Sequence, residues 1–283
     1  MSWQKYSLTF RLLSPLHIGW RKLSNLMQTR PYVTGKVMWG ALTARLVRDH
    51  NAGATGTDYE RIGLQVNEMF GFGYLYPALP TVADQPVQCA NALTLHYPWS
   101  DPHFDYRFLD SQASTALNYD QQAAESGLLH ETEFIRPYAR PLSDETSAPQ
   151  VYLVGDLYVR TELPAELQGW QDALTQLQVG GERGYGWGRI ELIGCDKTEV
   201  IHSDSIQLLL KKSDSLLAHL ATKSHHQAGV TGPIEPLIGW ERDNKNGAAW
   251  KLSDKAVICY APGSKVTTDS TFQIGPYGIW EAA

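Results

Sequence analysis

The segment GGERGYGWGR, from Gly180 to Arg189, holds five glycines in nine residues. Glycine permits positive φ and close backbone approach, so several N–H groups of such a turn can face a phosphate. Arg183 and Arg189 add positive charge, and Tyr185 and Trp187 offer flat faces on which a base can stack. The segment lacks the GK[ST] ending of a Walker A loop, and it follows a predicted helix, unlike a dinucleotide fingerprint. A tight turn with its aromatic side chains in the core explains these residues equally well.

The elements around this loop predict a mixed fold. Apolar residues alternate at 7–13 and at 150–161, and the segment RIELIG at 189–194 has the same character, so we expect three strands. Spacings of three and four predict helices at 36–50 and 163–178. The succession of strand, helix, glycine-rich turn and strand is typical of an α+β protein of ferredoxin-like (RRM-like) type.

The remaining segments are predicted to be irregular or to form a separate part. We expect a loop at 21–30, a flexible turn at 51–60 and long loop insertions at about 71–150, where Gly, Pro, Asp and Ser are frequent. After Cys195 the chain reads as short strands separated by turns. The expected organisation is therefore a ferredoxin-like domain at 1–197 and a smaller β-rich domain at 198–283.

Charge is unevenly distributed along the chain. The formal net charge is -6, which argues against a generally basic nucleic-acid binder. The first fifty residues, however, hold eight Lys or Arg and one acid, Asp49, whereas 101–133 holds seven acids and only Arg107. One interpretation is that the N-terminal cations form a binding face for a polyanion on an otherwise acidic protein. The other is that they are clustered by chance on a solvent-exposed face.

Composition also excludes several classes of protein. Three widely spaced cysteines, Cys89, Cys195 and Cys259, give neither a disulfide framework nor a CxxC metal pair. No apolar run is long enough for a membrane span, and the N-terminal apolar runs are too short for a signal peptide. We therefore expect a cytoplasmic protein with no membrane contact, no metal and no cofactor.

Four segments together resemble the RAMP superfamily of CRISPR-associated proteins (repeat-associated mysterious proteins). They are SPLHIG at 14–19, YVTGKVMWGALTAR at 32–45, GLLHETE at 127–133 and GGERGYGWG at 180–188. They are similar, in this order, to the "SPLHIG" turn, the "IPGSSLKGALR" helix start, the "GxLxExE" strand and the "GGxxSxGxG" loop of type III effector subunits. The resemblance covers about the first 195 residues.

This resemblance implies a ferredoxin-like fold that holds CRISPR guide RNA in a multisubunit ribonucleoprotein, beside other RAMP subunits and the large subunit. The glycine-rich loop, with Gly180 and Gly181, and the start of the first helix would lie against the RNA backbone. Together with the charge count, it predicts a phosphate-binding face of Arg21, Lys22, Arg30, Lys36, Arg45 and Arg48, reinforced by Arg183 and Arg189. The predicted stacking residues are His17, Tyr185 and Trp187, and charge with interleaved aromatics suggests a secondary patch at Arg136 and Arg140.

Departures from the family pattern predict a subunit that does not cut RNA. Target-cutting relatives carry an aspartate between the first turn and the first helix, but here no carboxylate precedes Asp49. Lys36 and Val37 replace the usual Ser-Ser, and Gly184 replaces the serine of the last loop. The leading hypothesis is a non-catalytic, single-copy subunit, similar to family five, that grips the 5′ handle of the guide RNA.

Two alternatives remain open at this stage. A metal-free CRISPR repeat endoribonuclease would use histidine as general acid or base, and this chain has nine histidines, of which His17 is the favoured candidate. The others considered are scattered: His50, His96, His103, His130, His225 and His226. A protein-only scaffold subunit would instead use the acidic 101–133 segment and the C-terminal half to bind neighbours.

Overall fold

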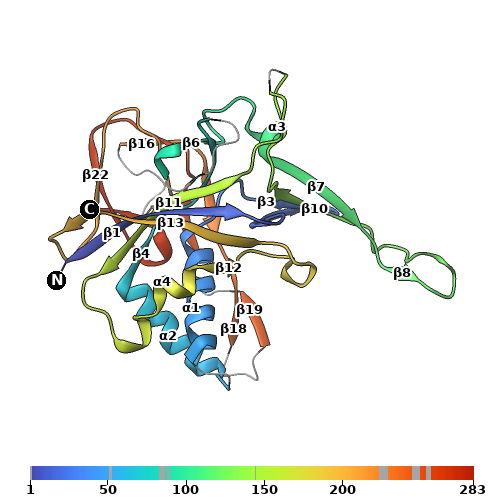
Figure 1. Ribbon diagram of the computed structural model, residues 1–283, viewed down its shortest axis with the longest axis horizontal. Coiled ribbons are helices and arrows are strands. Elements are labelled where there is room, and N and C mark those ends of the chain that lie inside the picture. The colour runs from blue at the N-terminus through green and yellow to red at the C-terminus, as the bar shows by residue number, and fades with distance from the viewer. Residues whose placement is uncertain are drawn as a thin grey trace.

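The computed structural model describes residues 2–50, 53–82, 87, 90–143, 145–222, 229–243, 249–252 and 256–283. Its largest sheet has seven strands and runs through the middle of the molecule (Figure 1). The order is β12-β13-β1-β11-β5-β6, with β4 also paired to β11. The strands are β1 (Trp3–Leu12), β4 (Phe70–Phe72), β5 (Tyr76–Pro80), β6 (Leu93–Leu95), β11 (Tyr152–Arg160), β12 (Gln176–Gln178) and β13 (Arg189–Ile201).

Helices cover one face of this sheet, below it in Figure 1. They are α1 (Gly35–His50), α2 (Gly56–Met69) and α4 (Trp170–Leu174). The alternating Leu8, Phe10 and Leu12 of β1 pack in one buried cluster with Met38 and Leu42 of α1. The elements β1, α1, β4, β11, α4 and β13 follow one another in the β–α–β–β–α–β order of a ferredoxin-like unit. The predicted α+β class is therefore confirmed.

A second sheet of four strands has the order β2-β3-β10-β7. It consists of β2 (Gly19–Leu23), β3 (Leu26–Thr29), β7 (Leu109–Ser114) and β10 (His130–Ile135). The loop predicted at 21–30 is thus wrong, because this segment forms most of a β-hairpin whose turn is closed by Ser24 at φ 56°. β7 and β10 continue into an arm that projects from the body and carries β8 (Leu117–Asn118) and β9 (Ala123–Ala124) (Figure 1).

The chain after 201 is rich in short strands, as predicted. A six-stranded sheet has the order β14-β22-β23-β15-β20-β17, and two further strand pairs are β16 with β21 and β18 with β19. The strands are β14 (Gln207–Leu210), β15 (Leu220–Ala221), β16 (Val230–Thr231), β17 (Ile234–Leu237), β18 (Trp240–Asp243), β19 (Ala249–Leu252), β20 (Val257–Tyr260), β21 (Lys265–Val266), β22 (Ser270–Ile274) and β23 (Trp280–Ala282). Tyr32, Tyr74 and Tyr76 pack with Leu216 and Leu220 in one buried cluster, so the two parts of the chain share a core.

One helix prediction and one turn prediction are wrong. Residues 163–178 form a 3-10 turn, η2 (Ala165–Leu167), then the short α4 and the strand β12, instead of one helix. The turn predicted at 51–60 gives way at Gly56 to α2, whose first amides are capped at Thr55 and Asp58.

The expected insertions at 71–150 are also more ordered than predicted. They contain β5 to β10, the 3-10 turn η1 (Ala90–Ala92) and α3 (Phe104–Phe108). The other 3-10 turns are η3 (Arg183–Tyr185) and η4 (Pro276–Gly278).

Cys195 and Cys259 are both free thiols, and Cys89 lies outside the described residues. Among the helices that the structure describes, none is long and apolar enough to cross a membrane.

Candidate nucleic-acid interface

The SPLHIG turn and the glycine-rich loop, far apart in the sequence, are joined by main-chain hydrogen bonds. The amide of Gly188 donates to the carbonyl oxygen of Pro15 at 2.7 Å. The amide of Gly181 donates to the carbonyl oxygen of His17 at 2.8 Å. Two of the four segments that the sequence singled out therefore form one continuous surface.

Two glycines of the loop are required by this junction. Gly180 and Gly188 have φ of 79° and 76°, in the left-handed region. A Cβ on Gly180 would lie 2.3 Å from the carbonyl oxygen of His17, and one on Gly188 would lie 1.8 Å from that of Val179. These glycines are needed by the fold itself, whatever the loop binds.

Gly184 differs from those two glycines. Its φ is not in the left-handed region, and a Cβ built on it would meet no described atom within 4 Å. Gly186 is also open to space, although its φ of 82° favours glycine. The described neighbours of Gly184 would therefore tolerate a Cβ, and the main chain of the loop is exposed at this residue.

The two aromatic residues of the loop have different surroundings. Tyr185 is 80% exposed at the outer end of the loop. Trp187 is half-buried, and its ring packs edge-on against Phe134 of β10, with ring centroids 5.0 Å apart. The loop thus offers Tyr185 for stacking, while Trp187 attaches the loop to the second sheet.

His17 is not placed to stack a base. Its side chain is 7% exposed, and its Nδ1 lies 2.7 Å from the carbonyl oxygen of Glu133. Because a carbonyl oxygen only accepts, Nδ1 carries the proton and donates. The ring packs beside Gly181, whose hypothetical Cβ would lie 3.0 Å from Cδ2. The prediction of a stacking His17 is therefore corrected: the residue holds β10 against the turn.

Four of the predicted phosphate-binding side chains are available to a ligand. Within the described residues, Lys22, Lys36, Arg183 and Arg189 are exposed and form no ion pair. They lie on the edge strand β2, at the start of α1, in the glycine-rich loop and at the start of β13. Arg21 is also exposed, with its guanidinium bonded to Gln28 and 4.1 Å above the ring of Trp20.

Arg45 and Arg48 lie at the other end of α1. At 1.5 Å rise per residue, Arg45 is about 14 Å along the helix from Lys36. Its Nε donates to Asp49 at 2.9 Å, and Nε of Arg48 donates to the carbonyl oxygen of Ala44. The structure does not bring this pair together with the cations of the loop.

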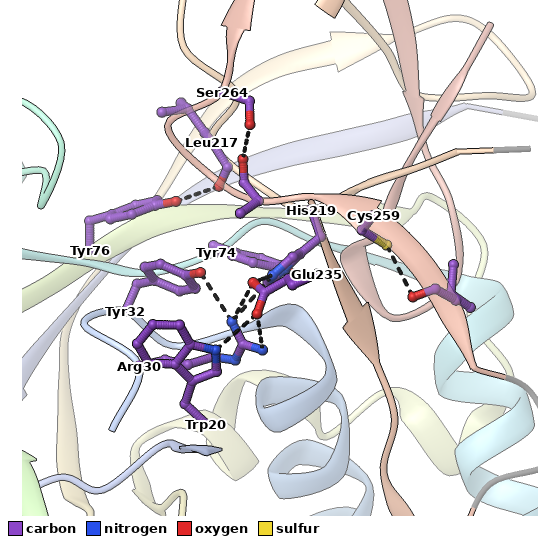
Figure 2. Close-up of polar contacts among 12 residues, drawn as sticks. Trp20, Arg30, Tyr32, Tyr74, Tyr76, Leu217, His219, Glu235, Cys259 and Ser264 are labelled. Atoms are coloured by element: carbon purple, nitrogen blue, oxygen red, sulfur yellow. Dashed lines mark hydrogen bonds and ion pairs between the residues drawn. The ribbon is translucent and has the colours of Figure 1, made fainter. Parts of the chain in front are cut away.

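Arg30 does not lie on the predicted phosphate-binding face, because its side chain is buried. It forms a two-pronged ion pair with Glu235 of β17, with Nη1 2.8 Å from Oε1 and Nη2 3.2 Å from Oε2 (Figure 2). The same carboxylate accepts from Nε1 of Trp20 at 2.9 Å and from Nε2 of His219 at 2.6 Å. One carboxylate from the C-terminal sheet thus holds both ends of the β2–β3 segment.

Burial and hydrogen bonding set the charges in this cluster. Burial acts to raise the pKa of Glu235, but the hydrogen bonds from His219 and Arg30 outweigh it and hold the pKa well below its usual range. Burial lowers the pKa of His219, and with the positive charge of Arg30 it outweighs the hydrogen bond and negative charge of Glu235, which raise this pKa. The lowered pKa favours neutral His219, and its contacts fit one tautomer, with Nε2–H directed at Glu235 and Nδ1 accepting from the Tyr74 hydroxyl at 2.7 Å.

Arg136 and Arg140, the predicted secondary patch, are both paired internally. Arg136 and Arg140 form ion pairs with opposite oxygens of Asp110 at the base of the arm. Arg140 also lies 5.6 Å from the ring centroid of Tyr106. These two arginines brace α3 and β7 and do not extend the exposed basic face.

Two of the other candidate histidines are engaged in local contacts. His96 pairs with Asp101 at 2.7 Å, and Nδ1 of His130 bonds the carbonyl oxygen of Leu128. His225 and His226 lie outside the described residues, as does the side chain of His50. Within the part of the chain that the structure describes, no three His, Cys, Asp or Glu side chains are grouped to hold a metal ion.

Sequence reasoning missed Trp20, Glu235 and His219. Trp20 stands between the SPLHIG turn and the basic pair Arg21–Lys22, so its position among cations was a usable signal. Nothing in the sequence links Glu235 or His219 to it, because more than 190 positions separate these residues.

Comparison with known proteins now bears on the fold. The chain matches the family model of the RAMP superfamily over residues 9–191. No curated protein sequence is similar enough to be counted as a relative. A chain of a type III-B Cmr-beta complex bound to cognate target RNA and AMPPnP has a similar structure, with a TM-score of 0.51, 11% identity, and coverage of 92% of this chain and 85% of that one. A chain of the same complex bound to cognate target RNA alone gives a TM-score of 0.50, 11% identity and coverage of 92% and 86%. The match of the family model over most of the chain shows that this protein belongs to the RAMP superfamily.

Proposed function

We propose that this chain is a guide-RNA-binding subunit of a type III CRISPR effector complex, without catalytic activity of its own. The observation that carries the proposal is the set of exposed, unpaired cations on the elements joined by the SPLHIG turn. Arg183 and Arg189 belong to or directly follow the glycine-rich loop, whose main chain is open at Gly184, while Lys22 lies on β2 and Lys36 at the start of α1. Unpaired Lys and Arg beside accessible backbone amides suit the phosphates of a single strand.

The comparisons support the choice of polyanion. Both similar structures come from a type III-B complex bound to its cognate target RNA. Their likeness covers 92% of this chain. Membership of the RAMP superfamily makes guide RNA the favoured ligand over DNA or a small polyanion.

The absence of catalysis is inferred from the residues near the interface. No Asp or Glu occurs between Met1 and Arg48, so the segment before α1 offers no carboxylate for acid–base chemistry. His17 is buried with its Nδ1 engaged, and His219 is fully buried behind Tyr74 and Glu235. The position at the 5′ handle is proposed because a β-rich C-terminal part suits a capping subunit present once.

Equilibrium binding of the purified chain to fluorescent guide RNA tests this proposal. We expect tighter binding to RNA that carries the repeat-derived 5′ handle than to an RNA of equal length with a scrambled handle. The logarithm of the affinity should fall with the logarithm of salt concentration, by about 0.7 for each phosphate neutralised. Equal affinity for both RNAs would remove the handle assignment, and a flat salt profile would remove phosphate binding altogether.

A cleavage assay tests the inactive role separately. The chain is incubated with repeat RNA in chelator, and with target RNA in Mg²⁺, and the products are separated on a denaturing gel. We expect intact RNA in both reactions. Cleavage in chelator that is lost in His17→Ala would establish the metal-free nuclease instead.

A further inference from the structure

Trp20 is an exposed aromatic residue held in one orientation by buried charge. Its side chain is 42% exposed on β2, an edge strand whose five residues are all exposed. Its indole Nε1 donates to Oε2 of Glu235 at 2.9 Å. An exposed tryptophan usually retains several rotamers, whereas this ring is fixed at its polar edge from a different sheet (Figure 2).

The carboxylate of Glu235, which fixes Trp20, has both of its oxygens fully hydrogen-bonded. Each oxygen of Glu235 accepts two hydrogen bonds: Oε1 from Arg30 and His219, and Oε2 from Arg30 and Trp20. The Tyr74 hydroxyl fixes the far side of His219. Burying charged groups costs desolvation free energy, which is offset only if their hydrogen bonds are made, as those of the Glu235 carboxylate are here. The consequence visible at the surface is a preorganised indole ring.

The surroundings of the ring indicate the ligand. The guanidinium carbons of Arg21 and Arg30 lie 4.1 Å and 5.8 Å from the ring centroid, and Lys22 follows without an ion partner among the described residues. Single-stranded RNA is recognised by unstacked bases on aromatic rings and guanidinium planes, with cations on the neighbouring phosphates. An indole–guanidinium pair beside a free lysine provides all three features.

From this geometry we propose that Trp20 and Arg21 form a stacking platform for one unpaired nucleobase of the bound RNA, and that Glu235 is the positioning residue of the platform. This inference rests on the proposed function. It adds Trp20, which the sequence did not predict, gives Arg21 a stacking role beside its predicted phosphate contact, and gives the C-terminal sheet a part in RNA binding. The platform is indifferent to base identity, because every base has a flat face.

A cycle of protein and RNA changes tests the platform. Trp20→Ala and wild-type protein are titrated with handle-bearing guide RNA and with a series in which one nucleotide at a time is abasic. We expect Trp20→Ala to bind unmodified RNA about tenfold more weakly. One abasic position should cost wild-type protein a similar factor and cost Trp20→Ala almost nothing.

Three further variants separate stacking from folding and from charge. Trp20→Phe keeps a ring and should regain most of the affinity, and Arg21→Lys keeps the charge without the plane and should lose part of it. Tyr119→Ala, at an 85% exposed aromatic on the arm, is the matched control and should bind as wild type. The salt slope of Trp20→Ala should equal that of wild type, because no charge is lost.

The outcomes distinguish the two proposals. If wild-type protein binds no RNA, the proposed function fails. If it binds, but Trp20→Ala binds equally well or every abasic position costs both proteins the same, the platform alone is overturned.

Discussion

Glu235 is the residue that joins the two parts of the chain at the interface. Its side chain is 17% exposed and that of Arg30 is 10%, so neither charge is well solvated. Removing one partner of such a pair leaves the other charge buried and uncompensated, which costs more than the pair itself contributes. The stability of the chain should therefore be sensitive to Glu235 and insensitive to exposed pairs.

Glu235→Gln should lower the free energy of unfolding by about 3 kcal/mol. A glutamine has one accepting oxygen, and its amide would face donors on Arg30, Trp20 or His219. The measurement is urea unfolding followed by circular dichroism, with Asp49→Asn as control, since the exposed Arg45–Asp49 pair contributes at most about 1 kcal/mol. Equal losses of stability in the two variants would show that burial does not make the Arg30–Glu235 pair more costly to break than an exposed ion pair.

The same cluster makes stability depend on pH. Arg30, Glu235, Tyr74 and Tyr32 surround His219, and its pKa in the folded protein lies below the unfolded value. The unfolded chain then binds more protons as pH falls below about 6.5, so stability is lost in that direction. Glu235, whose pKa is also lowered, removes further stability below about pH 4.5, where the unfolded carboxyl is protonated.

We expect the unfolding free energy of wild-type protein to rise between pH 5 and pH 7 more steeply than that of His219→Gln. The glutamine amide can still donate to Glu235 but does not titrate. Parallel denaturation series at half-unit pH intervals give both slopes, and the other titrating groups cancel in the comparison. Identical slopes would mean that His219 titrates normally and that its neutral form is not required.

At the scale of elements, the glycine-rich loop separates glycines needed by the fold from one that the fold tolerates. Gly188→Ala places a Cβ against the carbonyl oxygen of Val179 and puts an L-residue at φ 76°, so it should destabilise by more than about 1–2 kcal/mol. Gly184→Ala should leave the thermal midpoint unchanged. If RNA approaches the loop backbone, Gly184→Ala should still weaken RNA binding about fivefold or more, or about 1 kcal/mol. Thermal unfolding and RNA titration of both variants provide the check, and unaltered affinity in Gly184→Ala would place the RNA elsewhere.

Sequence periodicity located the elements with one strongly buried face. β1 and α1 were found because Leu8, Phe10 and Leu12 alternate and because α1 repeats its apolar residues every three or four positions. The segment 163–178 has a similar helical pattern, but it is folded as η2, α4 and β12, because Leu177 pairs with Ile190 across the sheet. The local sequence pattern carries no information about this strand pairing, because the partner strand is a separate segment of the chain.

The edge strand β2 was missed for a related reason. All five of its residues are exposed, so no alternation of apolar and polar side chains marks it. Of the predicted interface, the exposed cations and Tyr185 lie at the surface as expected. His17 and Arg30 are buried, and the partly exposed Arg136 and Arg140 are held in ion pairs. Their partners Glu133, Glu235 and Asp110 are brought to them only by tertiary structure.

At the scale of the whole molecule, charge is separated in space as well as along the chain. Among the described residues, the free cations of the predicted face are Lys22 and Lys36 in the first fifty residues and Arg183 and Arg189 at the glycine-rich loop. The segment 109–135, which forms β7, β10 and the projecting arm, holds five acids and no Lys or Arg (Figure 1). In the four-stranded sheet, β2 with Arg21 and Lys22 is one edge and β7 of the arm is the other, so a polyanion is attracted to the β2 edge and repelled from the arm. This separation reconciles an acidic net charge with RNA binding.

Two double variants with equal net charge test whether RNA affinity depends on where the cations lie. Lys22→Glu with Arg183→Glu, and Arg45→Glu with Arg48→Glu, both lower the formal net charge from -6 to -10. The first pair alters free cations at the loop and β2, and the second alters the far end of α1. We expect the first to reduce the salt slope of guide-RNA binding by about 1.4, which corresponds to two phosphate contacts, and the second to change it little. If both double variants weaken RNA binding equally, affinity depends on the net charge of the protein and not on the position of its cations. The proposed RNA interface at the glycine-rich loop and β2 would then be wrong.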